Sequence, residues 1–306
     1  MADSRKVPII RQIWQKRYIY LLLLPGVVYF SVFCYAPMYG LLLAFKRFNA
    51  SMGILRSPFI GLANFERIFI TSAFYRAFQN TLIISFSRLL IEFPSPIILA
   101  LLINEMRGKK LKRVYQTIYT FPNFLSWVIV ATILSTFLSN AGAVNGVLNA
   151  LGFGRFNFLA NLTTFRGILY ATSIWKNAGW SAIIFMAAIA GINPELYEAA
   201  VIDGAGRLRN IWHITLPGIM PTVVVMFILS IGNVMNAGFD QIFNLSNAVV
   251  MPVSDIIDTY VYSITFGAVP NYGFSTAVGM FKSVINLCLL LSANYLVKYV
   301  SGHALF

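Results

Sequence analysis

The chain of 306 residues is 58% hydrophobic and only 11% charged, and its mean hydropathy is +0.73. About a quarter of the residues in a soluble domain are charged, so this composition excludes a soluble fold and indicates a membrane protein. It also excludes a disordered chain and a disulfide scaffold, because the two cysteines, Cys34 and Cys288, lie inside long apolar runs. The net charge of +13 comes from Lys and Arg clustered at the ends of apolar runs. Anionic lipid headgroups, and not nucleic acid, are therefore the expected partner of this charge.

Residues 1–17 predict an amphipathic cytoplasmic segment that lies along the inner leaflet. Ile9, Ile13 and Trp14 share one helical face, while Arg11 and Lys16 lie on the other. The apolar run that follows is longer than the core of a signal peptide and has no small-residue cleavage site. We therefore interpret it as an uncleaved first span, and residues 18–306 as one transmembrane domain.

Six apolar segments are long enough to cross the bilayer, which requires about 20 helical residues. Continuous apolar runs favour helices, because the strands of a barrel alternate and are only ~10 residues long. The sequence therefore predicts an all-α integral membrane protein with six transmembrane helices. The expected spans are Tyr18–Phe45, Ala77–Ile103, Val114–Leu138, Gly167–Ile192, Gly218–Phe239 and Phe274–Val297.

The distribution of basic residues predicts that both termini are cytoplasmic. Lys and Arg are concentrated before the first span, between residues 104 and 113, and at Arg207 and Arg209, all of which would then be inside. The last outer connection, residues 240–272, has neither residue type. The first outer connection, which begins with Lys46 and Arg47, is more basic than the rule prefers.

The connection between the fourth and fifth spans, residues 193–217, predicts a helical hairpin. Asn193-Pro194-Glu195 is a typical helix start, since Asn caps free N–H groups and Pro fits the first helical position. Gly204-Ala205-Gly206 can end that helix. A second short helix is expected from Arg207 to Thr215, stopping at Leu216-Pro217, where the proline begins the next span. Such a hairpin suits a lever between a membrane domain and a soluble partner.

The order of residues in this hairpin resembles the EAA motif of permease subunits of ATP-binding cassette (ABC) importers. The matching positions are Glu198-Ala199-Ala200, Gly204, Ile214 and Leu216-Pro217. The whole chain is similar to the carbohydrate branch of that family, the maltose-type and LplB-like sugar permeases, including Leu24-Pro25-Gly26 and the Gly-Leu-x-Asn-Phe element at residues 61–65. A different interpretation is an ordinary helical hairpin, which Glu-Ala-Ala alone would favour.

The resemblance implies a type I ABC importer permease fold in a bacterial cell membrane. It further implies a second, homologous permease chain, two ATPase subunits that bind ATP and Mg²⁺, and an extracytoplasmic sugar-binding protein. Glu198 would contact the ATPase, Gly204 would allow the bend, and Leu216-Pro217 would anchor the hairpin to the fifth span. The coupling residues implied in this way are Glu198, Ala199, Ala200, Asp203, Gly204, Ile214, Leu216 and Pro217.

The sequence predicts neither an enzyme nor a bound cofactor in this chain. Its Gly108-Lys109 pair has Ile103 where the first glycine of a P-loop would stand. His213 and His303, the two histidines, lack a metal-binding pattern. ATP would therefore be bound by partner subunits.

Polar residues inside the spans are costly and are candidates for a substrate pathway. Arg88 and Glu92 are four residues apart and can pair on one helix face, either at the pathway or as a structural ion pair. Tryptophan faces stack on sugar rings while amides and ammonium groups bind hydroxyls, although the two Trp residues could instead belong to the aromatic belt. Asn236 could instead hold helices together. The predicted pathway residues are Arg88, Glu92, Trp175, Lys176, Asn177, Trp180, Ser230, Asn233, Asn236, Lys282 and Asn286.

These residues predict an oligosaccharide substrate, and the charges of Lys176 and Lys282 extend the prediction to an acidic one. An ABC permease for a non-sugar solute, such as an amino acid or phosphate, remains an alternative, since a fold alone does not name a substrate. A secondary transporter would require carboxylates at mid-membrane, where Glu92 is the one deep acidic residue. A membrane scaffold without transport activity would have no use for the central polar faces.

Overall fold

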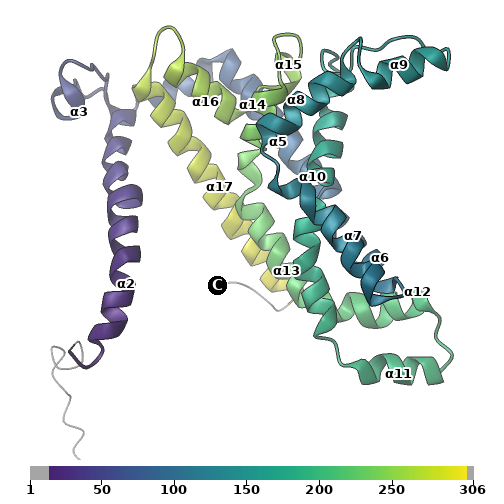
Figure 1. Cartoon of the computed structure of the whole chain (residues 1–306). Helices are drawn as coiled ribbons and strands as arrows, with labels where there is room; N and C mark the ends of the chain where they lie inside the picture. Colours follow the sequence, from purple (N-terminus) through teal and green to yellow (C-terminus); the bar gives the residue numbers. More distant parts are fainter. Residues whose placement is uncertain (1–13, 302–306) are drawn as a thin grey trace, which may run out of the picture. The chain divides into compact units, whose positions relative to one another are not determined.

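The computed structural model describes residues 14–301, and the described part is helical apart from turns, irregular connections and one isolated bridge between Lys46 and Phe59 (Figure 1). The amphipathic segment predicted for residues 1–17 and the histidine at 303 lie mostly or wholly outside this range. Contacts divide the chain into two compact units. The first contains residues up to 67 together with 271–280, and the second contains 68–270 together with the residues from 281 onward.

The first unit is built on a single apolar rod. The helix α2 (Arg17–Tyr29) continues through a π-helical turn, Phe30–Tyr35, and a 3₁₀ segment, Ala36–Phe45. Together they form a candidate span of 29 residues whose side chains are largely exposed, as required of a helix surrounded by lipid. Two short helices, α3 (Gly53–Arg56) and α4 (Ala63–Ile70), follow it. Asn64 holds α4 to the end of the rod by donating to the Ala44 carbonyl at 2.8 Å.

The second unit is a helical bundle with α10 at its centre. Figure 1 shows α11 and α12 at one end of this unit and α9, α14, α15 and α16 at the other. Its helices are α5 (Ser72–Ile91), α6 (Pro94–Glu105), α7 (Lys109–Thr120), α8 (Trp127–Leu138), α9 (Ala143–Ala150), α10 (Phe165–Ala190), α11 (Pro194–Ile202), α12 (Arg207–Asn210), α13 (Leu216–Gly232), α14 (Phe239–Leu245), α15 (Met251–Ser254) and α16 (Ile257–Phe266). The last helix, α17 (Tyr272–Ser301), begins in the first unit and continues into the second.

The centre of the bundle packs closely because small residues face neighbouring backbone. A Cβ added at Gly179 of α10 would collide with the Tyr119 carbonyl of α7, so a larger residue there would push the two helices apart. One buried cluster, which includes Ala100, Phe185 and Ile219, joins α6, α10 and α13. A second cluster, around Phe165, lies toward the α14 end of the unit.

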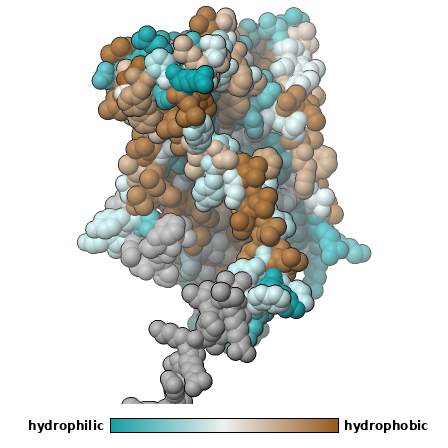
Figure 2. All heavy atoms as spheres, turned by 90° about the vertical axis from the view of Figure 1, so that its left-hand side faces the viewer, coloured by the Kyte–Doolittle hydropathy of each residue, from teal (hydrophilic) through white to brown (hydrophobic). Residues whose placement is uncertain are grey.

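Within residues 14–301, length and hydropathy identify five candidate spans, or six when the bent pair α10–α11 is one of them. This agrees with the expected six-span, all-helical class. Figure 2 shows hydrophobic residues over much of the face that it presents. The candidate spans are Arg17–Phe45, Ser72–Glu105, Trp127–Ala150, Arg207–Gly232 and Tyr272–Tyr295, with Phe165–Ala190 in the bent pair.

Two expected spans differ from the structure. The third was expected as one helix over Val114–Leu138, but α7 ends at Thr120 and α8 begins at Trp127. Pro122 and the Ser126 cap, which accepts from the Ile129 N–H at 3.3 Å, cause this break. The fifth was expected to run to Phe239, but α13 ends at Gly232.

The hairpin at residues 193–217 agrees with expectation at its start and differs at its end. Asn193 caps α11 by accepting from the Glu195 N–H at 3.1 Å, and Gly204 takes a left-handed conformation (φ +73°) after the helix. The second helix was expected to stop at Leu216-Pro217. Instead, α12 continues through a π-helical turn, Ile211–Thr215, directly into α13. A proline ring clashes with the carbonyl four residues earlier in a regular α-helix, and the wider π turn before Pro217 relieves that clash.

Candidate functional site

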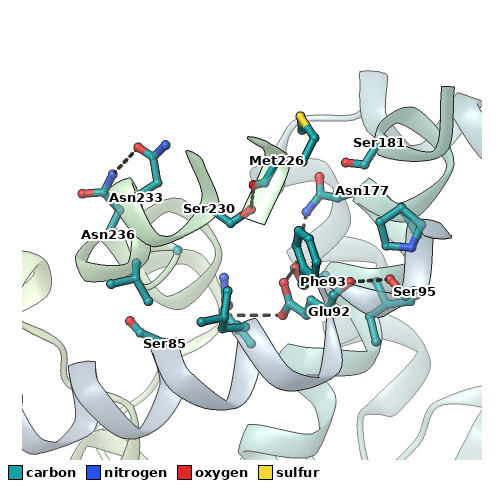
Figure 3. A pocket seen from close by; sticks show the side chains of 18 of the residues that line it. Ser85, Glu92, Phe93, Ser95, Asn177, Ser181, Met226, Ser230, Asn233 and Asn236 are labelled. Carbon is teal, nitrogen blue, oxygen red and sulfur yellow. Dashed lines mark hydrogen bonds and ion pairs between the residues drawn. The ribbon is translucent and has the colours of Figure 1, made fainter. Parts of the chain in front are cut away.

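A half-open cavity of about 270 Å³, with many polar residues in its lining, lies within the second unit (Figure 3). Its walls come from α5, the start of α6, α10 and α13, and from the segment that follows α13. Hydroxyl, amide and charged side chains are costly inside apolar spans, so their grouping here marks this pocket as the candidate site. The polar lining residues are Ser85, Arg88, Glu92, Ser95, Ser173, Asn177, Ser181, Ser230, Asn233 and Asn236.

An ion pair between Arg88 and Glu92 lies at one wall of this cavity. The guanidinium Nε is 3.5 Å from Glu92 Oε1, and the Ser173 hydroxyl donates to Glu92 Oε2 at 2.7 Å. Arg88 also donates to the side-chain oxygen of Gln241, whose amide nitrogen donates to the Leu169 carbonyl at 2.8 Å. The pair is therefore connected to α5, α10 and α14 together. Ser173 and Gln241 were not predicted from the sequence, because their partners lie far away along the chain.

The chain leaves its helical path beside this ion pair. After α13 ends, a 3₁₀ turn (Val234–Asn236) leads to Ala237 and Gly238, both left-handed, with φ values of 41° and 81°. Ala237 is the one non-glycine residue with positive φ among the described residues. Gly238 lies directly against the Arg88 guanidinium, which would collide with a Cβ there. The segment 233–238, which we call the α13–α14 break, therefore depends on glycine and on the position of Arg88.

The predicted polar residues of α13 come together at this break (Figure 3). Ser230 and Asn233 line the cavity with Asn236, whose side-chain nitrogen donates to Asn233 Oδ1 at 3.4 Å. Asn286 of α17 lies outside the lining: its nitrogen donates to the Gly232 carbonyl at 2.6 Å and so satisfies the free end of α13.

The structure does not bring the tryptophan and lysine cluster of α10 into this cavity. Lys176 is buried, donates to the Asn123 carbonyl at 2.7 Å, and lies 5.6 Å from the Trp127 ring centroid. Trp175 and Trp180 are about half exposed and do not line the cavity. Asn177 does line it, since it lies one helical turn from Ser173 and donates to that hydroxyl at 3.3 Å.

A second cavity of about 700 Å³ adjoins the first, since Asn236 and Gly238 line both. Lys282 of α17 lies on its wall, with Nζ 2.6 Å from Asp258 Oδ1 and 3.1 Å from Asn236 Oδ1. The sequence indicated Lys282 but not Asp258, its partner at the start of α16. The lining residues are Trp127, Asn236, Gly238, Phe239, Asp240, Asp258, Val261, Tyr262, Thr265, Phe266 and Lys282.

The arm formed by α11 projects from the opposite end of the bundle. It bends by 70° from α10 and has no buried residue, and Ile202 at its end is 85% exposed. One side-chain hydrogen bond, between the Tyr197 hydroxyl and Thr215 Oγ1 at 2.9 Å, connects α11 to the start of α13. Of the predicted coupling residues, those on the arm are exposed or half-buried, and Leu216 packs against the cluster around Phe185.

Comparison with known proteins identifies the family. Residues 95–302 match the model of the binding-protein-dependent transport system inner membrane component. LplB of Bacillus subtilis (strain 168) is 44% identical over 95% of this chain and 91% of its own length. The polygalacturonan/rhamnogalacturonan transport system permease protein YteP of the same organism is 43% identical, over 97% and 92%.

A solved structure has the same fold. A chain of a bacterial ABC transporter involved in the import of the acidic polysaccharide alginate matches with a TM-score of 0.89 and 39% identity, over 96% of this chain and 100% of that one. The expected fold class and the family resemblance are thereby confirmed. The chain belongs to the inner membrane components of binding-protein-dependent transport systems and is a multi-pass permease subunit of an ABC importer in the bacterial plasma membrane.

Proposed function

We propose that this chain forms half of the translocation pathway of an ATP-driven importer of oligosaccharides, and that its substrates are acidic ones. The observation that carries the proposal is the pair of adjoining cavities, both lined in part by polar side chains, that meet at the α13–α14 break. Hydroxyl and amide groups such as those of Ser230, Asn233 and Asn236 both donate to and accept from sugar hydroxyls. YteP is described as a permease for polygalacturonan and rhamnogalacturonan, and the matching structure belongs to an alginate importer. Acidic saccharides are thus the class that the relatives favour.

The remaining parts of the importer would be supplied by other chains. In this proposal a second, homologous permease completes the pathway, two ATPase subunits bind ATP and Mg²⁺, and an extracytoplasmic binding protein delivers the saccharide. The structure of a bacterial alginate ABC transporter has also been solved in complex with an alginate pentasaccharide-bound periplasmic protein. A chain of that structure matches this one with 38% identity and a TM-score of 0.89. The excess of Lys and Arg near the α11 end supports a cytoplasmic position for this end and for both termini.

The arm formed by α11 is proposed to be the coupling element. Its exposed apolar residues, Val201 and Ile202, suit a groove on a soluble partner, and Glu198 and Ala199 lie exposed on the same arm. Because Tyr197 is bonded to Thr215 at the start of α13, a displacement of the arm would move α13. The other end of α13 leads into the break at the cavities.

Movement of α13 would then open the pathway to one side of the membrane at a time, which is alternating access by rigid-body motion. Coupling of this kind is reciprocal for binding equilibria, so a loaded binding protein outside should change nucleotide affinity inside.

A crosslinking experiment tests the coupling arm. Cysteine at Ala200 should crosslink to the ATPase subunit in native membranes, whereas cysteine at Ala143, which is exposed at the opposite end of the unit, should not. Gly204→Leu should lower both uptake and co-purification of the ATPase, because leucine is strained at a φ of +73° and would redirect the arm. Equal crosslinking from both ends, or unchanged uptake by Gly204→Leu, would refute this role for α11.

A further inference from the structure

The second cavity combines three kinds of side chain that suit an acidic sugar. One wall is aromatic: Phe239, Tyr262 and Phe266 line it, and the Tyr262 ring centroid is 5.9 Å from that of Phe239 and 5.0 Å from that of Phe266. Aromatic faces of this kind pack against the apolar faces of sugar rings. Asn236, Asp240 and Asp258 supply acceptors for hydroxyl groups, and Lys282 supplies the cation.

The ammonium group of Lys282 retains capacity for a ligand. It has three N–H donors, and the described residues that bond it are two, Asp258 and Asn236. Its side chain borders the cavity, so a carboxylate in the cavity can take the third donor or displace Asp258. Lys176 differs, because its ammonium is buried against the Asn123 carbonyl and it lines neither cavity.

If a ligand displaced Asp258 from Lys282, the negative charge of Asp258 would still be partly compensated. Asp258 lies in the first turn of α16, a helix of 10 residues, where the free N–H groups and the helix dipole favour a negative charge. Asp240 acts in the opposite sense, because its exposed carboxylate on the same cavity repels an anionic ligand.

We propose that Lys282 binds a substrate carboxylate, and that the second cavity is a uronic-acid subsite from which the saccharide passes to the first cavity. This inference rests on the proposed function and assigns the selectivity of the pathway to one side chain. The route between the two cavities is short, because Asn236, which accepts a hydrogen bond from Lys282, also lines the first cavity.

The test compares two sugars of the same shape in the complete importer reconstituted in proteoliposomes. Trigalacturonate is the acidic probe, and its fully methyl-esterified form is the neutral one, each supplied on saturating binding protein. For Lys282→Gln, the ratio of acidic to neutral uptake should fall by about tenfold or more, which corresponds to about 1.4 kcal/mol. Lys282→Arg should restore most of the ratio, and Asp240→Asn should raise it.

A double variant separates this role from a structural one. Lys282→Gln alone leaves the Asp258 carboxylate without its cation, which can impair folding. Lys282→Gln with Asp258→Asn removes both charges, so the protein should recover its melting temperature while the selectivity ratio stays low. The proposal would be overturned if the double variant recovered both its stability and the ratio of acidic to neutral uptake. It would also be overturned if that ratio were the same in Lys282→Gln as in the unmodified importer. If the unmodified importer transports neither probe with ATP, the proposed function itself fails, and the inference falls with it.

Discussion

Two ion pairs inside the bundle have nearly equal exposure and very different surroundings. The side chains of Arg88 and Glu92 are 15% and 21% exposed, and those of Lys282 and Asp258 are 16% and 26% exposed. The first pair is further bonded by Ser173 and Gln241, side chains from two other helices, and a glycine backbone lies against its guanidinium. Lys282 has one additional bond, to Asn236. Exposure alone therefore does not separate a structural pair from one that can bind a ligand; the partners of each pair do.

The largest effect is expected from closing the space beside Arg88. Gly238→Ala adds a Cβ that collides with the guanidinium and also forces alanine to a φ of +81°. Steric overlap and left-handed strain together should lower the free energy of unfolding by about 3 kcal/mol. Thermal unfolding of the purified importer measures this change.

Gly154→Ala is the matched control for that variant. Gly154 also has positive φ (78°), but a Cβ there meets nothing within 4 Å. Only the backbone strain of about 1 kcal/mol should remain. Equal losses for the two variants would show that Arg88 does not determine the α13–α14 break.

Double-mutant cycles compare the two ion pairs directly. Arg88→Met should cost about 2–3 kcal/mol because it leaves Glu92, whose side chain is 21% exposed, without its cation, and Glu92→Gln in the same chain should recover part of that loss. The corresponding cycle for Lys282 and Asp258 should give a smaller coupling energy, because fewer protein groups hold that pair. Coupling energies of equal size would show that the surrounding protein groups do not hold the Arg88–Glu92 pair more firmly than the Lys282–Asp258 pair.

A variant of Lys176, the other lysine inside the spans, provides a control for Lys282. Lys176→Met removes the hydrogen bond to Asn123, which connects α10 to the turn between α7 and α8, and should lower the melting temperature by an amount equivalent to about 1–3 kcal/mol. The ratio of acidic to neutral uptake should nevertheless stay close to that of the unmodified importer, because Lys176 lines neither cavity. A drop in that ratio as large as the drop for Lys282→Gln would contradict the assignment.

The smallest expected effect concerns a third pair, whose carboxylate, Asp255, lies outside the spans. Asp255 is buried 3.9 Å from the Arg76 guanidinium, and burial raises the pKa of its carboxyl above the ordinary value, although the Thr259 hydroxyl and Arg76 oppose this change. A raised pKa means that the folded state prefers the neutral carboxyl. The stabilisation is therefore full below the ordinary aspartate pKa and is lost as the pH rises through the raised one. Asp255→Asn should flatten this part of the dependence of melting temperature on pH, measured between about pH 4 and pH 8; an unchanged slope would exclude Asp255 as its source.

The sequence predicted those features that depend on neighbouring residues. The Asn193 cap, the turn at Gly204 and the pairing of Arg88 with Glu92 all follow from residues within one helical turn or one loop, and the structure contains all three. The left-handed Ala237 could not be predicted, because alanine favours a right-handed helix and its conformation depends on tertiary contacts.

Contacts between distant residues were beyond sequence analysis for a similar reason. Lys176 and Lys282 look equivalent as isolated lysines in apolar spans. Their different partners, the Asn123 carbonyl and the Asp258 carboxylate, are set by how the helices pack. The Trp residues beside Lys176 were likewise predicted to line the pathway because of their residue type. The rotation of α10 instead directs Asn177, and not Trp175, to the first cavity.

Uptake of a labelled uronic-acid oligosaccharide by proteoliposomes that contain the complete importer is the decisive test that this chain belongs to an ATP-driven importer of acidic saccharides. We expect accumulation that requires ATP and the loaded binding protein, and that falls when the pair formed by Lys282 and Asp258 is neutralised. Accumulation that proceeds without ATP, driven by an ion gradient alone, would contradict it.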